Sequence, residues 1–329
     1  MKVMYTLEEV SSKINIGEPL FLAGDESLLT QLPKGKWIAG TIPYFMAEKG
    51  GEFSQNKIYV TELPQYISAI QIKAYTKDSL PSIYKDLPDN GFGLVVIPAT
   101  SPTHLEFAIK GPGYEGFGVS PLIGWISGVN LDDLGKVSPK IINGETGDVV
   151  EDGALVLQAT LPANKVADIN IVNIFQQGSG DELTFSNDGF SASSVLVNGV
   201  ETDFASYIAK NNLDTRLPLV ADYYGAMVNI SFQNVDQDKS EVLFYAPVFA
   251  GMKYKLAAPI DNYIESFTSH MPKEGTDNLM FSCNCILNYL YSELEGKQTG
   301  GITGPITFGE IAYQLLNQTM VYLTIDDIG

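Results

Sequence analysis

Glycine and proline recur along the whole chain, and their spacing leaves no room for long uninterrupted helices. The 329 residues include 31 glycines and 17 prolines, and the apolar runs between them are short. Because both residues favour turns, this pattern favours many short strands over a helical bundle. Apolar residues make up 45% of the chain, which allows a sizeable core and argues against disorder.

Short apolar runs alternate with helix-like segments, and this alternation predicts the fold class. Helices are expected at 26–32 after an Asp25 cap, from Pro64 to about 75, at 202–211 with Thr202 as its cap, at 261–270 with Asp261 as its cap, and at 285–295. Strands are expected at 19–23, 36–40, 57–63, 92–99, 136–142, 154–161, 169–175, 278–282 and 320–324, with a strand pair at 241–256.

This order of elements predicts an α/β protein, mixed α+β in detail, with layered mixed sheets and packed helices. No short internal repeat is visible in the sequence. Two halves sharing an interface are expected, residues 1–205 and residues 206–329. The glycine-rich segment 111–130 is expected to be either a rigid crossover in the core or a mobile lid over a ligand.

Charge and cysteine content exclude several classes of partner. The chain has 20 basic and 39 acidic residues, and this net charge of −19 repels nucleic acid and anionic membranes. The only cysteines are Cys283 and Cys285, which cannot form a disulfide framework and supply at most two ligands to a structural metal. The N-terminus shows no signal-peptide pattern, so a cytoplasmic location is expected.

The segment Leu279 to Cys285, LMFSCNC, is the strongest local feature. It predicts an apolar strand that ends in small polar residues, with a helix directly after it. Backbone amides at such a junction suit a carboxylate or similar anion, although Ser282 or Asn284 would serve equally well as a simple helix cap. Cys283 is a candidate nucleophile only if a base lies in reach, and His270 alone is near in sequence; a buried inert thiol is the other interpretation.

Two further segments contain candidate ligand-binding residues, but each of them is weak evidence when taken alone. Glu310 and Asn317 lie in the segment Gly304 to Thr319, between a turn and the last expected strand. Thr41 follows Gly40 at the end of an early strand. The histidines, His104 and His270, are isolated from each other in sequence; one axial histidine would suffice for haem, but no cofactor is expected.

Together these segments resemble the FIST family of bacterial sensory domains. The matching segments are GKWIAGTIPYF at 35–45, VLFYAPVFAGMKYKL at 242–256, Phe281-Ser282-Cys283-Asn284, Gly309-Glu310-Ile311 and Asn317-Gln318-Thr319. The chain departs from the family at Cys285-Ile286-Leu287, where an arginine-containing run is common, and at Ile42-Pro43, where small residues are usual.

The resemblance implies an intracellular sensory protein that binds an amino acid or similar small polar ligand and signals through a partner in trans. It implies one ligand site, formed by Thr41, Ser282, Cys283, Asn284, Glu310 and Asn317. Some FIST relatives bind haem. Two alternatives remain open: a cysteine-dependent hydrolase or transferase that uses Cys283, and an interaction protein without a ligand.

Overall fold

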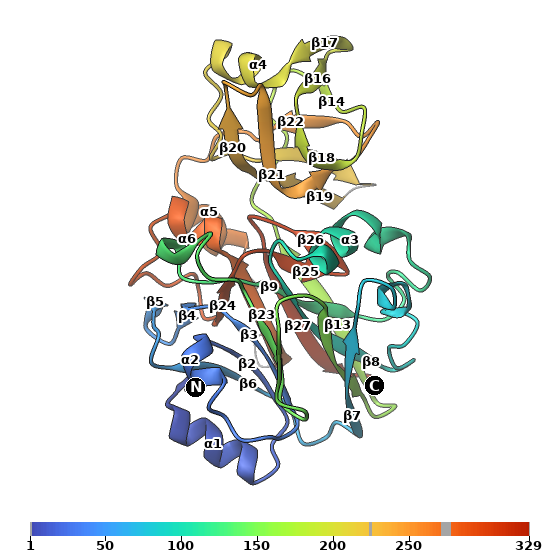
Figure 1. Ribbon diagram of the computed structural model, residues 1–329, viewed down its shortest axis with the longest axis vertical. Helices are drawn as coiled ribbons and strands as arrows, with labels where there is room; N and C mark the ends of the chain where they lie inside the picture. Colours follow the sequence, from blue (N-terminus) through green and yellow to red (C-terminus); the bar gives the residue numbers. More distant parts are fainter. Residues whose placement is uncertain (1, 224–225, 271–277, 329) are drawn as a thin grey trace. The chain divides into compact units, whose positions relative to one another are not determined.

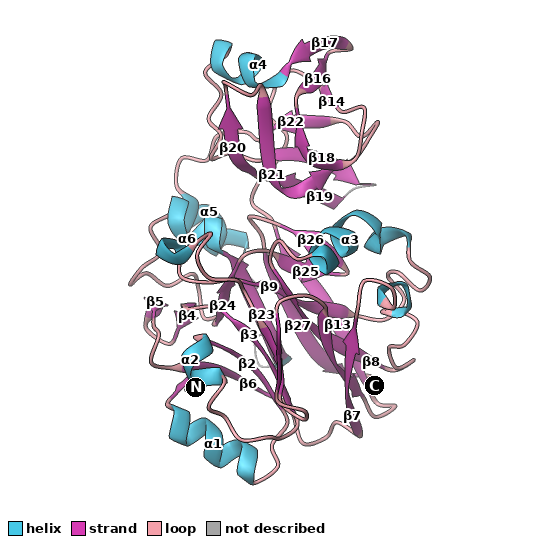
Figure 2. Cartoon of the chain, in the orientation of Figure 1, coloured by secondary structure: helices cyan, strands magenta, loops and turns pink. Residues whose placement is uncertain are grey.

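Two compact units make up the computed structural model, which describes residues 2–223, 226–270 and 278–328 (Figure 1). The first unit comprises residues 1–172, 271–315 and 320–329, and the second comprises residues 173–270 and 316–319. Both units are built mainly of strands, with short helices beside them (Figure 2). The fold is therefore mixed α+β with several mixed sheets, as the alternating pattern predicted.

Three six-stranded sheets form the described part of the first unit. Sheet 1 has the order β1 (Met4–Tyr5), β6 (Ile58–Glu62), β2 (Leu20–Gly24), β3 (Trp37–Thr41), β10 (Ile141–Asn143), β11 (Asp148–Val150). Sheet 2 has the order β7 (Ala69–Tyr75), β12 (Ala154–Thr160), β8 (Gly91–Pro98), β9 (Leu122–Ser127), β25 (Glu310–Ala312), β26 (Gln314–Leu316). Sheet 3 has the order β13 (Lys165–Val172), β27 (Met320–Asp327), β23 (Leu279–Cys285), β24 (Gly304–Thr307), β4 (Tyr44–Ala47), β5 (Gly50–Phe53).

The helices of the first unit are short. They are α1 (Leu7–Asn15), α2 (Glu26–Leu29), α3 (Pro102–Lys110) and α6 (Ile286–Tyr291), with single turns η1 (Leu80–Ser82), η2 (Gly111–Gly113) and η3 (Leu131–Asp133). Helices α1, α2 and α3 begin at side-chain caps. Thr6 and Glu9 form a reciprocal capping box before α1, and the Asp25 carboxylate accepts from the Ser27 amide at α2, as predicted.

One connection pattern occurs in all three sheets. Each sheet contains a parallel pair joined through a helix: β2–α2–β3, β8–α3–β9 and β23–α6–β24. The first strand of each pair also lies antiparallel to a later strand, β6, β12 or β27, which in turn pairs with an early strand, β1, β7 or β13. Residues 4–62, 69–160 and 165–327 are therefore three structural repeats, named here repeats 1, 2 and 3.

The repeats exchange hairpins in a closed ring. The hairpin β4–β5 of repeat 1 pairs with β24 of repeat 3, β10–β11 of repeat 2 pairs with β3 of repeat 1, and β25–β26 of repeat 3 pairs with β9 of repeat 2. Every sheet is thus completed by another repeat. The sequence showed no repeat because one topology accepts many apolar residues of suitable volume at the same position.

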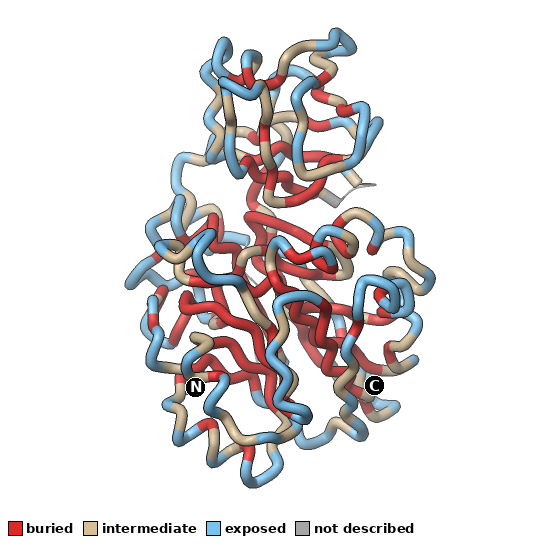
Figure 3. Tube along the Cα trace, in the orientation of Figure 1, coloured by how far each residue is buried: buried red, intermediate tan, exposed pale blue. Residues whose placement is uncertain are grey.

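Aromatic side chains from the three sheets meet in the core of the first unit. The ring centroid of Phe21 in sheet 1 lies 6.2 Å from that of Trp125 in sheet 2 and 5.2 Å from that of Phe281 in sheet 3. All three side chains are buried, as are most strands of these sheets (Figure 3). These contacts bury apolar surface from all three repeats at once, which is the dominant stabilising term in folding.

The second unit is inserted into repeat 3. The first two strands of repeat 1 are joined by α1, and those of repeat 2 by a segment containing η1. In repeat 3 the corresponding connection, between β13 and β23, contains the body of the second unit. The predicted division into halves after residue 205 does not coincide with the boundaries of the compact units. Residue 205 lies within α4 (Phe204–Lys210), which belongs to the insertion.

The second unit contains two sheets around an aromatic core. One sheet has the order β17 (Val200–Asp203), β16 (Ser194–Val197), β14 (Leu183–Thr184), β22 (Tyr254–Leu256), β18 (Leu219–Tyr223), β19 (Ala226–Ile230); the other has β15 (Gly189–Ala192), β21 (Glu241–Val248), β20 (Phe232–Asp236). Phe185 makes edge contacts with Phe204, Phe244 and Tyr254, and such aromatic pairs add to the stabilisation from burial.

A buried polar network ties residues 316–319 to the second unit. The Asn229 side-chain amide donates to Asn173 Oδ1 at 3.0 Å, to Asn317 O at 3.1 Å and to Gln318 O at 3.3 Å. Ser231 Oγ donates to Gln318 Oε1 at 2.6 Å. Because Asn229, Ser231, Asn317 and Gln318 are buried, these bonds replace ones that water would otherwise make.

Three local predictions are wrong, and each error has a physical reason. The expected helix from Pro64 is instead a turn followed by β7, because β12 offers seven paired positions that override a helix-like apolar pattern. Asp203, not Thr202, caps α4, and Asn262, not Asp261, lies at the start of α5 (Tyr263–His270) with its Oδ1 accepting from the Glu265 amide. In both cases the residue that follows the predicted cap in sequence is also a good N-cap residue, and it occupies the N-cap position.

Burial of His104 makes a prediction about acid stability. His104 lies in α3, where its Nδ1 accepts from the Thr100 amide, and burial lowers its pKa from 6.5 to about 4. The unfolded chain therefore binds more protons between these pH values, and stability falls as pH drops through that window. The His104→Asn variant, whose Oδ1 can replace Nδ1 as the acceptor for Thr100, should lose about 2 kcal/mol less stability than wild type between pH 7 and pH 5. Urea unfolding at both pH values measures this difference, and equal losses would contradict it.

Candidate functional site

The six residues predicted to form one ligand site are divided between the two units. Thr41, Glu310 and the segment Ser282 to Asn284 belong to the first unit, whereas Asn317 belongs to the second. All six are buried. Asn317 lies in the polar network described above, where its Oδ1 accepts from the Ser231 amide at 3.2 Å.

The three consecutive residues on β23 make separate contacts. Ser282 Oγ donates to Thr303 O at 2.6 Å, and Cys283 Sγ donates to Gly124 O at 3.3 Å. Asn284 Oδ1 accepts from the Cys285 amide and from Asn288 Nδ2, both at 2.8 Å. Cys285 is at the N-cap of α6 without a side-chain cap bond, so neither Ser282 nor Asn284 caps that helix.

Glu310 and Thr307 lie beside Cys283 in the core. Glu310 pairs across the sheet with Trp125, and both Glu310 and Thr307 have 0% of their surface exposed. Thr307 Oγ1 lies 3.3 Å from Glu310 Oε1 and donates to it. Burial raises the pKa of Cys283 well above its ordinary value, and the neighbouring Glu310 and Cys285 raise it further. The thiol is therefore protonated at neutral pH.

Thr41 makes its side-chain hydrogen bonds with other segments of the first unit. Its Oγ1 donates to Gly128 O at 2.8 Å and accepts from the Lys140 amide at 2.9 Å. A cavity of about 10 Å³ does lie beside Ser282, Cys283 and Asn284, and its other lining residues are Met46, Thr299, Ile302, Thr303, Gly304 and Met320. Thr41 and Glu310 are not among them, so the structure brings together only part of the predicted site.

Cys283 makes a second prediction. Its exposed fraction is 1%, as is that of Cys285, and a shielded, protonated thiol reacts slowly. Iodoacetamide should therefore label the folded protein slowly at neutral pH and both cysteines quickly after denaturation, as measured by mass spectrometry of the cysteine-containing peptide. Rapid labelling of Cys283 in the folded protein would contradict this assignment.

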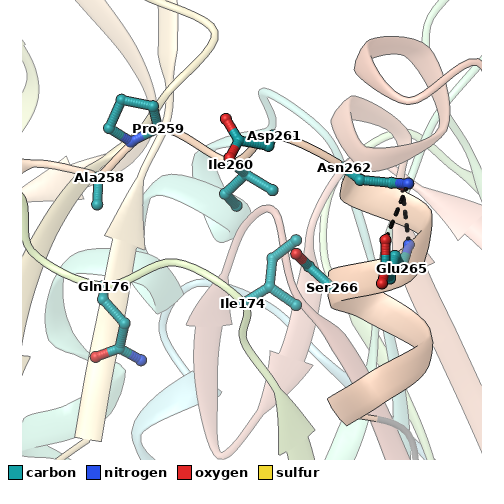
Figure 4. Close-up of a pocket in the computed structure, with 9 residues that line it drawn as sticks. All are labelled: Ile174, Gln176, Ala258, Pro259, Ile260, Asp261, Asn262, Glu265 and Ser266. Carbon is teal, nitrogen blue, oxygen red and sulfur yellow. Dashed lines mark hydrogen bonds between the residues drawn. The ribbon is translucent and has the colours of Figure 1, made fainter.

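A larger concavity, which the sequence did not predict, lies in the second unit. This groove has a volume of about 400 Å³ and is shown in Figure 4. Its lining residues are Ile174, Gln176, Ala258, Pro259, Ile260, Asp261, Asn262, Glu265 and Ser266. Two chain segments some eighty residues apart form it, so no local sequence pattern could have revealed it; Asp261 and the helix after it were the only visible signal.

The groove is lined by both acidic or polar residues and apolar residues. Asp261 and Glu265 supply two carboxylates, and none of the nine lining residues is cationic. Asn262 Nδ2 donates to Glu265 Oε2 at 3.3 Å, which holds that carboxylate at the start of α5 (Figure 4). Within the described residues, the side chains of Gln176, Asp261 and Ser266 make no hydrogen bond or ion pair, which leaves them available to a ligand.

Comparison with known proteins places the chain in a family. Residues 5–326 match the model of a family of unknown function, DUF6976. The chain belongs to this family. The match spans both units, and the family's description names no activity. No curated protein matches the chain.

Two further observations concern the described residues alone. No described helix is both long and apolar enough to cross a membrane. No group of three or more histidine, cysteine, aspartate or glutamate side chains suited to a metal ion occurs in the part of the chain that the structure describes.

Proposed function

We propose that the protein binds a small molecule carrying a cationic amine in the groove of the second unit, and that this binding serves a sensory role. The observation that carries the proposal is the groove, which combines a volume of about 400 Å³ with two carboxylates and, among its nine described lining residues, no cationic side chain. The net charge of −19 supports the same ligand class, because it attracts cations to the surface.

Size supports the groove over the cavity beside Ser282. Sites for small molecules commonly have volumes of about 300–1,000 Å³, and the groove falls within that range. The cavity beside Ser282 measures about 10 Å³, which is smaller than any amino acid. Ligand binding at the residues that resemble the FIST motif would require that part of the core to open.

The chemistry of the lining supports an amine. An ammonium group donates charge-assisted hydrogen bonds to carboxylates, and Asp261 offers a carboxylate that makes no other described bond. Gln176 and Ser266 provide neutral groups that orient a ligand, and Ile174 and Ile260 provide apolar contacts for its carbon chain. A ligand carboxylate would be repelled by Asp261 and Glu265, so a simple amine should bind better than an amino acid.

The sensory role rests on the resemblance to FIST domains. A sensor works only if its ligand has different affinities for two conformations, and a signalling partner in trans would recognise one of them. The competing proposal of an enzyme that uses Cys283 has less support, since that thiol is buried and protonated. His270, the base nearest to it in sequence, belongs to the second unit and contacts Ser266 O through Nδ1.

Replacement of Asp261 tests the site. The Asp261→Asn variant should bind putrescine, a simple diamine, at least about tenfold more weakly than wild type, because it loses a charged partner worth about 1.4 kcal/mol or more. Isothermal titration calorimetry measures the change. Asp238→Asn is the matched control, since it removes the same charge from an exposed position of the second unit outside the groove. Equal weakening by both variants would show that only net charge matters and would reject the groove.

A further inference from the structure

The side-chain amide of Asn284 has a defined orientation inside the core of the first unit. Asn284 is only 4% exposed. Its Oδ1 accepts two hydrogen bonds, one of them from the Cys285 backbone amide, and a backbone amide cannot donate to an NH₂ group. The oxygen and nitrogen positions of this amide therefore cannot be exchanged. Nδ2 faces away from the two groups that donate to Oδ1.

Nδ2 of Asn284 is a buried donor that no described protein group accepts. Leaving a buried amide donor without an acceptor is costly, so native proteins almost always supply one. Asn284 also lines the cavity of about 10 Å³ beside β23. The unpartnered Nδ2 indicates a bound group that accepts its hydrogen bond, and the adjacent cavity offers the space for that group.

The walls of the cavity limit the size of that group. Met320 and Ile302 are buried against it, and a Cβ atom added at Gly304 would lie 2.2 Å from Ser282 O, so the backbones are already in close contact. A cavity needs about 10–15 Å³ to hold one water molecule. Nothing larger fits without separating β23 from β24.

We propose that the Phe281-Ser282-Cys283-Asn284 segment binds one internal water molecule, which accepts a hydrogen bond from Asn284 Nδ2. The segment that most resembles a ligand-binding motif is then a structural site that stabilises the junction of β23 and α6. This inference is independent of amine binding in the groove, because the two sites share no residue.

Water-to-amide NOE measurements on asparagine-labelled protein test the proposal in solution. The Asn284 side-chain amide should show a cross-peak to a slowly exchanging water. The Asn229 side-chain amide should show none, since protein oxygens accept its hydrogens. Absence of the Asn284 cross-peak, or equal cross-peaks for both residues, would overturn the proposal.

A crystal structure of the full chain provides the second test. At a resolution that shows other internal waters, one density peak should lie within about 3.2 Å of Asn284 Nδ2. A cavity without density, or density for a multi-atom ligand, would overturn the proposal. Neither result would affect amine binding in the groove, so failure of this inference is distinguishable from failure of the proposed function.

Discussion

Replacing Gly124 with alanine should leave little folded protein. A Cβ atom at this position would lie 1.8 Å from Val95 O, its neighbour across the parallel pair β8–β9. Backbone atoms cannot move aside as a side chain can, so the pair must separate. The carbonyl oxygen of Gly124 also accepts a hydrogen bond from Cys283 Sγ. Displacement of Gly124 should therefore weaken this contact between repeats 2 and 3 as well. The expected cost is at least about 4 kcal/mol, a large part of the stability of a typical protein.

Urea unfolding of Gly124→Ala and of a matched control measures this effect. Gly113→Ala is the control, because a Cβ atom there meets nothing within 4 Å and Gly113 does not have a positive φ. The control should retain wild-type stability to within about 1 kcal/mol. A folded Gly124→Ala protein with near-wild-type stability would contradict the close pairing of β8 with β9.

Asn229→Ala should strongly destabilise the second unit. The variant leaves the buried carbonyls of Asn317 and Gln318 without the side-chain amide that donates to them. It also removes one of the two donors to Asn173 Oδ1, which still accepts from the Phe175 amide. Each unsatisfied buried group costs about 1–3 kcal/mol, so a total of about 3–4 kcal/mol is expected after partial relaxation. Residues 316–319 should lose their attachment first, because Asn229 bonds two of their carbonyls.

Hydrogen exchange followed by mass spectrometry measures this loss segment by segment. Exchange in Asn229→Ala should increase in β19 and at residues 316–319, while β2 and β3 of repeat 1 keep wild-type protection. Gln237→Ala is the control, since it removes a single bond, to Ala205 O, elsewhere in the second unit. Unchanged protection at 316–319 would contradict the assignment of these residues to the second unit.

The sequence predicted about half of the described strands of the first unit, but not their arrangement. The runs around Phe21, Ile38 and Val95 were recognisable because short apolar segments bounded by turns are typical of buried strands. The segment after Pro64 was predicted as a helix because the spacing of Ile67 and Ile70 fits a helix. The spacing of Ile70 and Ile72 fits a strand equally well, and only pairing with β12 determines that this segment forms β7. The exchange of hairpins among three repeats depends on contacts far apart in sequence, which no local pattern records.

The candidate site was predictable only where it is local. The segment Ser282 to Asn284 stood out because polar residues end an apolar strand there, and the structure does bury them together. Thr41 and Asn317 were joined to it by resemblance alone, and their hydrogen bonds lie elsewhere. The groove was missed because Gln176 and Asp261 come together only when the insertion folds.

Repeat 3 differs from the other two repeats in two respects. It contains the insertion, and its strand β23 carries Ser282 and Asn284 where the corresponding strands β2 and β8 are largely apolar. The features to which a function can be attached therefore lie in one repeat, while the other two complete the core and the sheets.

Calorimetric titration of the wild-type protein with putrescine and with butanediol tests the central claim most directly. The two molecules have the same carbon chain and differ in charge, so the carboxylates of the groove should distinguish them. We predict saturable binding of putrescine with one site per chain, weakened by added salt because the ion pairs lie at the surface, and no measurable binding of butanediol. Absence of putrescine binding, or equal binding of both molecules, would contradict the claim that the groove is an amine site.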